Sequence, residues 1–163
     1  MTLTLTSSDN CIVQVAQTVM TAATSVTSNT SEIEVTGLRS TITPKYATSK
    51  ILLQANITYA SRNTTYKGYF KRNGSIPTGS RGDAAGSRQV AHTAFGLVTD
   101  TNQFFTHPMC FLDDPNTTDE LTYSFWFIND NNVPIYINRS ETDADNATGG
   151  RMVSTVTLME ITS

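Results

Sequence analysis

The residues of this sequence that could bind a metal lie in its last third, where acidic side chains alternate with small ones. Glu141, Asp143 and Asp145 stand at every second position, and Asn146 follows them. Carboxylate and carbonyl oxygens are the ligands of calcium, but an EF-hand loop also needs glycine at its sixth position and glutamate at its twelfth. Those positions hold Asn146 and Met152. We therefore interpret this segment as a surface loop with Asx turns rather than as a calcium site.

Other residues with chemical potential do not form a catalytic set. His92 and His107 are the only histidines, and no Ser, Cys or carboxylate stands at a spacing that would make a triad with either. Arg81-Gly82-Asp83 matches the integrin-binding tripeptide, but three-residue matches arise easily in a Gly-rich loop. The sequence shows no carboxylate pair, phosphate-binding loop or zinc spacing. It therefore predicts a protein that is not an enzyme and carries no cofactor and no metal.

Charge, cysteine content and the N-terminus exclude further classes. The net charge is −3 and the isoelectric point about 5.2, so no basic face is expected for nucleic acid. No stretch approaches the length of a membrane span, and residues 1–10 lack the features of a signal peptide. Cys11 and Cys110 each stand in an apolar run, which predicts two buried free thiols rather than a disulfide. Seven asparagines, Asn138 among them, begin N-x-S/T sequons, which arise by chance in a chain rich in Asn and Thr.

The remaining pattern favours strands and turns. Thr makes up about a sixth of the chain, and short runs of Val, Ile, Tyr and Phe are bounded by turn residues. Lys50–Ala60 alternates most clearly, Asn73-Gly74 is a tight-turn signal, and Gly37 is expected to break a strand. Strands are predicted at 11–19, within 21–31, at 32–35, 39–43, 50–60, 65–72, 88–95, 104–112, 121–128, 133–139 and 151–161. The last is expected to be central to the fold.

One domain is the default at 163 residues. Strands at this spacing, with no helical period, predict an all-β antiparallel sandwich or jelly roll over residues 12–163. Residues 1–11 are expected to form an N-terminal arm. Leu3 and Leu5 alternate with threonines in that arm, so it could add as a strand to a sheet edge of another protein.

Several strands are apolar on both faces. Trp126 and Ile128 lie on the face opposite to Phe125 and Phe127. Cys110 and Leu112 likewise lie on the face opposite to Met109 and Phe111. Because an antiparallel sheet usually keeps one face polar, such strands need a second cover. A neighbouring subunit is the interpretation we prefer, and a loop folded over the sheet is the alternative. The predicted subunit-interface residues are Leu112, Trp126, Ile128 and Tyr136.

The order of several motifs resembles the C-terminal domain of fibre-like virion proteins from phages of aquatic bacteria, including cyanophages. The segments that carry this resemblance span about residues 12–161: Val35–Leu38, Ile42–Pro44, Ser49–Leu52, Phe111–Pro115, Tyr136–Asn146, Gly150-Arg151 and Ser154–Ile161. The resemblance implies a trimeric jelly roll of the C1q/TNF-like kind. Unlike a fibre, this chain has only about ten residues before the domain, so no shaft is expected.

Four functions from different classes remain open. The first is a structural virion protein, a homotrimeric decoration (cement) protein or short fibre on the head or tail, assembled in the host cytoplasm and attached through Leu3 and Leu5. The second is a receptor-binding tip that recognises host-surface glycan through loops 61–65, 74–87 and 139–150, with Arg62, Asn63, Arg81, Asp83, Asp143 and Asp145 as candidate contacts. The third, a polysaccharide-degrading enzyme, lacks a carboxylate pair. The fourth, a secreted C1q-like protein, lacks a signal peptide and a collagen-like segment.

Overall fold

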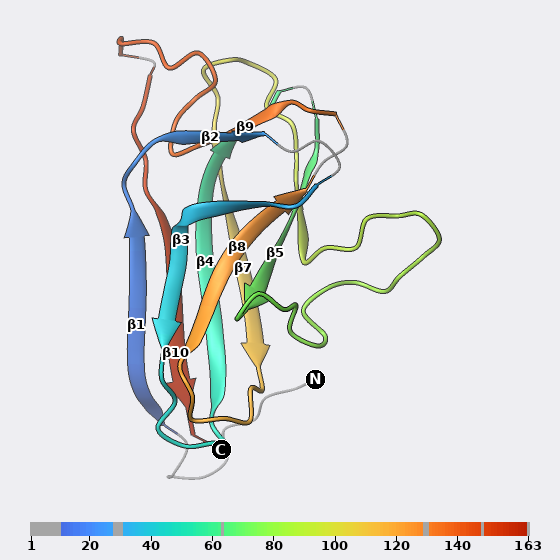
Figure 1. Ribbon diagram of the computed structural model, residues 1–163. Coiled ribbons are helices and arrows are strands. Elements are labelled where there is room, and N and C mark those ends of the chain that lie inside the picture. Colours follow the sequence, from blue (N-terminus) through green and yellow to red (C-terminus); the bar gives the residue numbers. More distant parts are fainter. Residues whose placement is uncertain (1–10, 28–30, 63, 129–130, 148, 163) are drawn as a thin grey trace.

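The fold is an all-β sandwich of two antiparallel sheets (Figure 1). The computed structural model describes residues 11–27, 31–62, 64–128, 131–147 and 149–162. These residues contain ten strands and no helix, so no described helix could span a membrane. The strands are β1 (Ile12–Met20), β2 (Thr24–Thr27), β3 (Ile33–Ile42), β4 (Lys50–Ala60), β5 (Tyr66–Arg72), β6 (Thr93–Phe95), β7 (Phe105–Asp113), β8 (Leu121–Ile128), β9 (Pro134–Ile137) and β10 (Ser154–Ile161).

The first sheet, sheet A, has the order β1-β10-β4-β7, and β2 and β9 extend it at one end. Beyond Asn56, the last β4 residue that pairs with β10, Tyr59 and Ala60 of β4 pair with β9. β2 pairs with β9 in the same way as β1 pairs with β10. The final strand β10 therefore lies inside the sheet between β1 and β4, which confirms its predicted central position.

The second sheet, sheet B, has the order β3-β8-β5-β6. The two sheets exchange consecutive strands in the manner of a jelly roll, so the predicted fold class is confirmed. Alternate residues of β4, from Ile51 through Leu53, Ala55 and Ile57 to Tyr59, point into the space between the sheets and are at most 3% exposed. Aromatic rings of sheet B face them, with Phe95, Phe125 and Phe127 packed edge to face.

Gly37 does not end a strand, contrary to the prediction. β3 continues through it, but its pairing with β8 shifts between Glu34 and Arg39, which is a β-bulge. Val35 and Leu38 in the bulge are buried, and a Cβ at residue 37 would lie 2.8 Å from the sulfur of Met20. A side chain at residue 37 would therefore force the Met20 side chain to move from its place on the bulge.

Other local predictions had mixed outcomes. Asn73 and Gly74 both have positive φ, 48° and 80°, as a tight type I′ turn requires, so that turn is confirmed. The strand predicted at 88–95 is confirmed only in its last three residues, because β6 begins at Thr93 and residues 82–91 form a loop. β7 keeps an unbroken register with β4 through His107 and Pro108. Proline is tolerated there because β7 is an edge strand.

A buried carboxylate joins the two sheets at the end of β7. Asp113 is 3% exposed and accepts hydrogen bonds from Arg72 of β5 and Tyr123 of β8, both at 2.6 Å. Burial and the hydrogen bond to Asp113 raise the pKa of Tyr123 well above its ordinary range. The phenol of Tyr123 therefore stays protonated at neutral pH, and the hydrogen bonds among the three side chains fix sheet A to sheet B.

Asn138 occupies the junction where β10 gives way to β9. It is fully buried, has a positive φ of 61°, and follows the last residue of β9. Its side-chain amide donates to the carbonyl oxygens of Met20 and Ala22 at 2.7 and 3.1 Å, and its side-chain oxygen accepts from Ser154 at 2.7 Å. Its backbone N–H donates to Thr58. One side chain therefore joins β10 to the link between β1 and β2, while its backbone bonds to β4.

We expect Asn138→Gly to lower the free energy of unfolding by about 3 kcal/mol, because it removes the hydrogen bonds to the buried Met20 carbonyl, the partly buried Ala22 carbonyl and the buried Ser154 hydroxyl. Glycine accepts the positive φ, so this change isolates the side-chain bonds. Asn138→Ala should cost about 1 kcal/mol more because of the backbone conformation. Urea denaturation of both variants measures this, with Asn116→Gly, at an exposed asparagine that also has a positive φ, as the control. A loss for Asn138→Gly no larger than that control's would contradict the role of the side chain.

Glu160 of β10 holds the loop between β3 and β4 at the other end of sheet A. It is fully buried and accepts hydrogen bonds from the Gln14 side chain at 2.6 Å and the Lys45 backbone N–H at 2.8 Å. Burial alone would raise the pKa of Glu160, but these bonds outweigh it and lower the pKa below its ordinary value of 4.5. The folded state is therefore stabilised when the Glu160 carboxyl group is ionised.

A group whose pKa is lowered by folding contributes stability above its unfolded pKa and loses it as the pH falls through its folded pKa. Glu160→Gln should therefore be less stable than the wild type at pH 7, by about 1.5–3 kcal/mol for the lost charge-assisted bonds. The difference should shrink as the pH falls below 4.5. Denaturation curves across this range test it, and a difference independent of pH would contradict the assignment.

Candidate functional site

The candidate functional site is the outer face of sheet A, the side turned away from sheet B. Four apolar residues form a row across its four main strands, because Val15 pairs with Met159, Met159 with Leu52, and Leu52 with Leu112. Val15 is 58% exposed, and the other three are only partly buried. A polar face would be expected on this side of an antiparallel sheet. The row instead gives the face a continuous apolar strip.

Polar side chains flank the strip. The neighbouring row runs from Gln17 through Thr157 and Gln54 to Cys110, and the next contains Asn56 and Pro108. A shallow hollow lies between β4 and β7, lined by Gln54, Asn56, Pro108 and Cys110. These short, uncharged groups can pack and hydrogen-bond against a second surface without burying a charge.

The prediction of two buried cysteines is wrong. Cys11 and Cys110 are free thiols, and both are exposed. Cys110 is exposed because β7 pairs with β4 in a register that turns Met109 inward and Cys110 outward. Each cysteine stands in an apolar run, but alternation along a strand, not the run, decides which side chain is buried.

The four predicted interface residues lie on two different faces. Leu112 lies on the outer face of sheet A, and Tyr136 of β9 alternates with the buried Ile135 and Ile137, so it points the same way at the far end. Trp126 and Ile128 lie on the outer face of sheet B, on the other side of the sandwich. The four therefore do not form one patch.

Trp126 has a cover within its own chain. The ammonium of Lys71 lies 4.0 Å from the centre of the indole ring and pairs with Glu32 beyond it. The indole N–H donates to Ser124 at 2.8 Å. Burial would raise the pKa of Glu32, but the hydrogen bonds, led by that from Lys71, lower it. An ion pair over an aromatic ring thus accounts for an apolar side chain on this face.

The candidate ligand loops also divide between two places. Arg62 and Glu141 approach to 3.8 Å, and Thr142 donates to Thr101, so loops 61–65, 96–104 and 139–153 meet at one end of the sandwich. That end is opposite to the one where β1 begins and β10 ends (Figure 1). Arg81 and Asp83 lie in the loop after β5, where Arg81 stacks over Tyr69 of sheet B.

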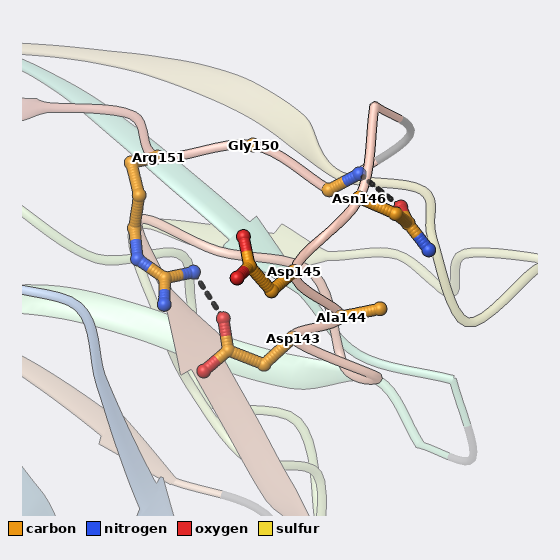
Figure 2. Close-up of a pocket in the computed structure, with 7 residues that line it drawn as sticks. Asp143, Ala144, Asp145, Asn146, Gly150 and Arg151 are labelled. Atoms are coloured by element: carbon orange, nitrogen blue, oxygen red, sulfur yellow. Dashed lines mark hydrogen bonds and ion pairs between the residues drawn. The ribbon is translucent and has the colours of Figure 1, made fainter.

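The acidic loop surrounds an arginine of its own chain. Figure 2 shows Asp143 facing Arg151, with Asp145 beside them and Gly150 on the opposite strand of the loop. The guanidinium pairs with the Asp143 carboxylate, and Asn146 caps the turn by accepting from the Gly149 N–H at 3.1 Å. Among the described residues, no group of three or more His, Cys, Asp or Glu side chains could hold a metal. The Asp143 carboxylate is thus paired with a cation of the protein itself.

The histidines are held by local bonds. A ring nitrogen of His107 lies 2.6 Å from the Thr93 hydroxyl, and a ring nitrogen of His92 lies 2.9 Å from the Ser80 carbonyl oxygen. Burial, with the nearby His92, lowers the pKa of His107, which favours the neutral ring at neutral pH. Leu3, Leu5 and Asn63 lie outside the described residues.

The comparisons with known proteins add no assignment: the chain matches no model of a protein family and no curated protein sequence. Function is therefore argued from the geometry. Leu52, Met159 and Val15 are the site residues that sequence reasoning missed. One signal was available for Leu52. In the alternation of Lys50–Ala60 it is an apolar residue on the side that is otherwise polar.

Because Arg151 already neutralises Asp143, we expect added calcium to leave the melting temperature unchanged. Differential scanning fluorimetry with calcium, and with a chelator, measures this. Arg151→Ala, which removes the competing cation, is the matched variant. A calcium-dependent rise in the melting temperature of the wild type would contradict the interpretation of this loop.

Proposed function

We propose that this protein is a structural component of a bacteriophage virion, a homotrimeric decoration or short fibre protein of the head or tail, with a C1q/TNF-like jelly roll. The observation that carries the proposal is the exposed apolar row Val15–Met159–Leu52–Leu112 on the outer face of sheet A. The resemblance of the motif order to fibre-like virion proteins supports the phage origin.

The geometry supports self-assembly through this face. Exposed apolar surface on a soluble protein usually marks an interface, and this face offers a strip four strands wide with neutral polar residues beside it. No Asp, Glu, Lys or Arg stands in the three outward rows from Val15 to Pro108. Copies can therefore approach without like-charge repulsion or the burial of an unpaired charge. Trp126 and Ile128, which face the other way, are placed at the outer surface of the trimer.

In the proposed trimer, the two ends of each sandwich would face in different directions relative to the virion. β1 begins and β10 ends at one end of the sandwich, while loops 61–65, 96–104 and 139–153 lie at the other. An N-terminal arm with Leu3 and Leu5 would start from the first end and attach to the virion. The loops would then point away from the particle. This polarity also suits the second candidate, a receptor-binding tip, because these loops carry the candidate ligand residues Arg62, Asp143 and Asp145.

Two experiments test the role itself. A density map of virions that contain this protein should place the start of β1 against the particle and the opposite end, with loops 96–104 and 139–153, outward. Absence of the chain from purified particles would contradict the proposal. A glycan array separates the receptor-binding candidate. Binding that Arg151→Ala abolishes without changing the oligomeric mass would favour the tip over a purely structural protein.

At a protein concentration too low for trimers to associate with one another, we expect light scattering to give a mass three times the chain mass of 17.8 kDa. Leu112→Asp should reduce it to the mass of one chain, because the substitution places an unpaired charge in a dry contact. The matched control is Thr41→Asp, an exposed position on sheet B, which should leave the trimer intact. Circular dichroism checks that both variants fold. A monomeric wild type, or a trimer that survives Leu112→Asp, would contradict the proposed interface.

A further inference from the structure

β1 is an unusual edge strand. Among the described residues it pairs only with β10, so the backbone groups on its other side have no strand partner. It is nine residues long, Ile12–Met20, and contains no charged residue and no proline. Ile12, Val15 and Val19 are 56%, 58% and 49% exposed. A long, uncharged, partly apolar edge is a ready template for pairing with another strand.

The other edges of the sandwich carry protective features that β1 lacks. β2 and β6 have only four and three residues. β7 contains Pro108, and β3 contains the ion-paired Glu34 and Arg39 with a bulge between them. Short length, proline, charge and bulges are the devices by which native proteins prevent edge-to-edge pairing. Every other described edge strand has at least one of these features, so among the described edges only that of β1 is open to strand pairing.

We propose that the edge of β1 is a strand-pairing site for β1 of a second copy of this chain, in an antiparallel register centred on Gln17. A charged strand would place like charges near each other across a two-fold axis, which destabilises self-pairing, and β1 has none. The pairing would extend sheet A across the two copies. Its outer face would continue without interruption from one copy to the next, because Val15 belongs to the apolar row.

The side chains select the register. Directly opposed residues of an antiparallel pair point to the same face. Centring on Gln17 places Val15 opposite Val19 of the second copy, twice, so the two most exposed valines of β1 cover each other. Gln17 meets Gln17, and an amide side chain can both donate and accept a hydrogen bond. Each trimer would present three such edges, so strand pairing joins one trimer to another.

This inference does not require the trimer. The pairing doubles whatever unit is present: the trimer in the wild type, or the single chain in Leu112→Asp. If the wild type forms no trimer but its mass still doubles with concentration, only the proposed function is contradicted. If the trimer forms but its mass does not double, only this inference is contradicted.

Charge pairs at position 17 test the site by sedimentation over a wide concentration range. They are made in the Leu112→Asp chain, because Gln17 also lies in an outward row of the proposed trimer face, where a charge would itself disturb the trimer. The Leu112→Asp chain should double in mass as its concentration rises. Gln17→Lys and Gln17→Glu should each fail to double, because each opposes two like charges, and an equimolar mixture should double again. Thr41→Lys on β3 is the matched control and should double normally. Failure of the mixture to double would overturn the proposal.

Disulfide trapping tests the register in a chain with both natural cysteines changed to serine. Opposed residues have Cα atoms about 4.5–5.5 Å apart, which a disulfide can span. Gln17→Cys should therefore form covalent dimers on its own. Val19→Cys should not, because its counterpart would be roughly 13 Å away, but it should link to Val15→Cys in a mixture. Equal cross-linking of all three single variants would overturn the register. Amide-exchange protection of β1 at concentrations where no doubling occurs would show that another segment covers the edge, which would overturn the pairing.

Discussion

The structure depends on the hydrogen bonds of one buried side chain, Asn138. Sheet A changes strands at this point, since β10 pairs with the first part of β4 and β9 with its end. Such an exchange leaves backbone groups without a ladder partner, and buried groups of that kind are costly. Asn138 supplies the partners, reaching Met20 and Ala22 on one side and Ser154 on the other. Its burial also means that its sequon is not accessible in the folded protein.

The shape of the candidate site follows from that arrangement. Because β10 pairs in register with both β1 and β4, and β4 with β7, side chains from four strands align into rows on the outer face. The same register that buries Leu53 and Leu158 turns Leu52 and Met159 outward. The apolar strip and the core therefore both arise from the alternation of side chains along the same strands. At the opposite end of the sandwich, Glu160 fixes the loop after β3. β1 forms one edge of the face.

Local features of the fold could be predicted from the sequence, and long-range ones could not. Lys50–Ala60 and the Asn73-Gly74 turn depend on alternation and backbone conformation, which neighbouring residues determine. Trp126 and Leu112 looked alike because both oppose a core residue, yet they belong to different sheets, and sheet membership depends on pairing between distant strands. Gly37 suggested a break because the sequence does not reveal that Met20 packs against it. Asn138 resembled many other asparagines, since its partners lie up to 118 positions away.

The central claim is that the outer face of sheet A is buried between copies of this chain. Cys110 reports on it directly, since it lies in that face and is exposed in the single chain. The most direct measurement is the alkylation rate of Cys110 under native conditions, in a chain whose Cys11 has been changed to serine. The account predicts slow alkylation in the assembled protein and fast alkylation when Leu112→Asp is added. Equal rates in the two proteins would contradict it.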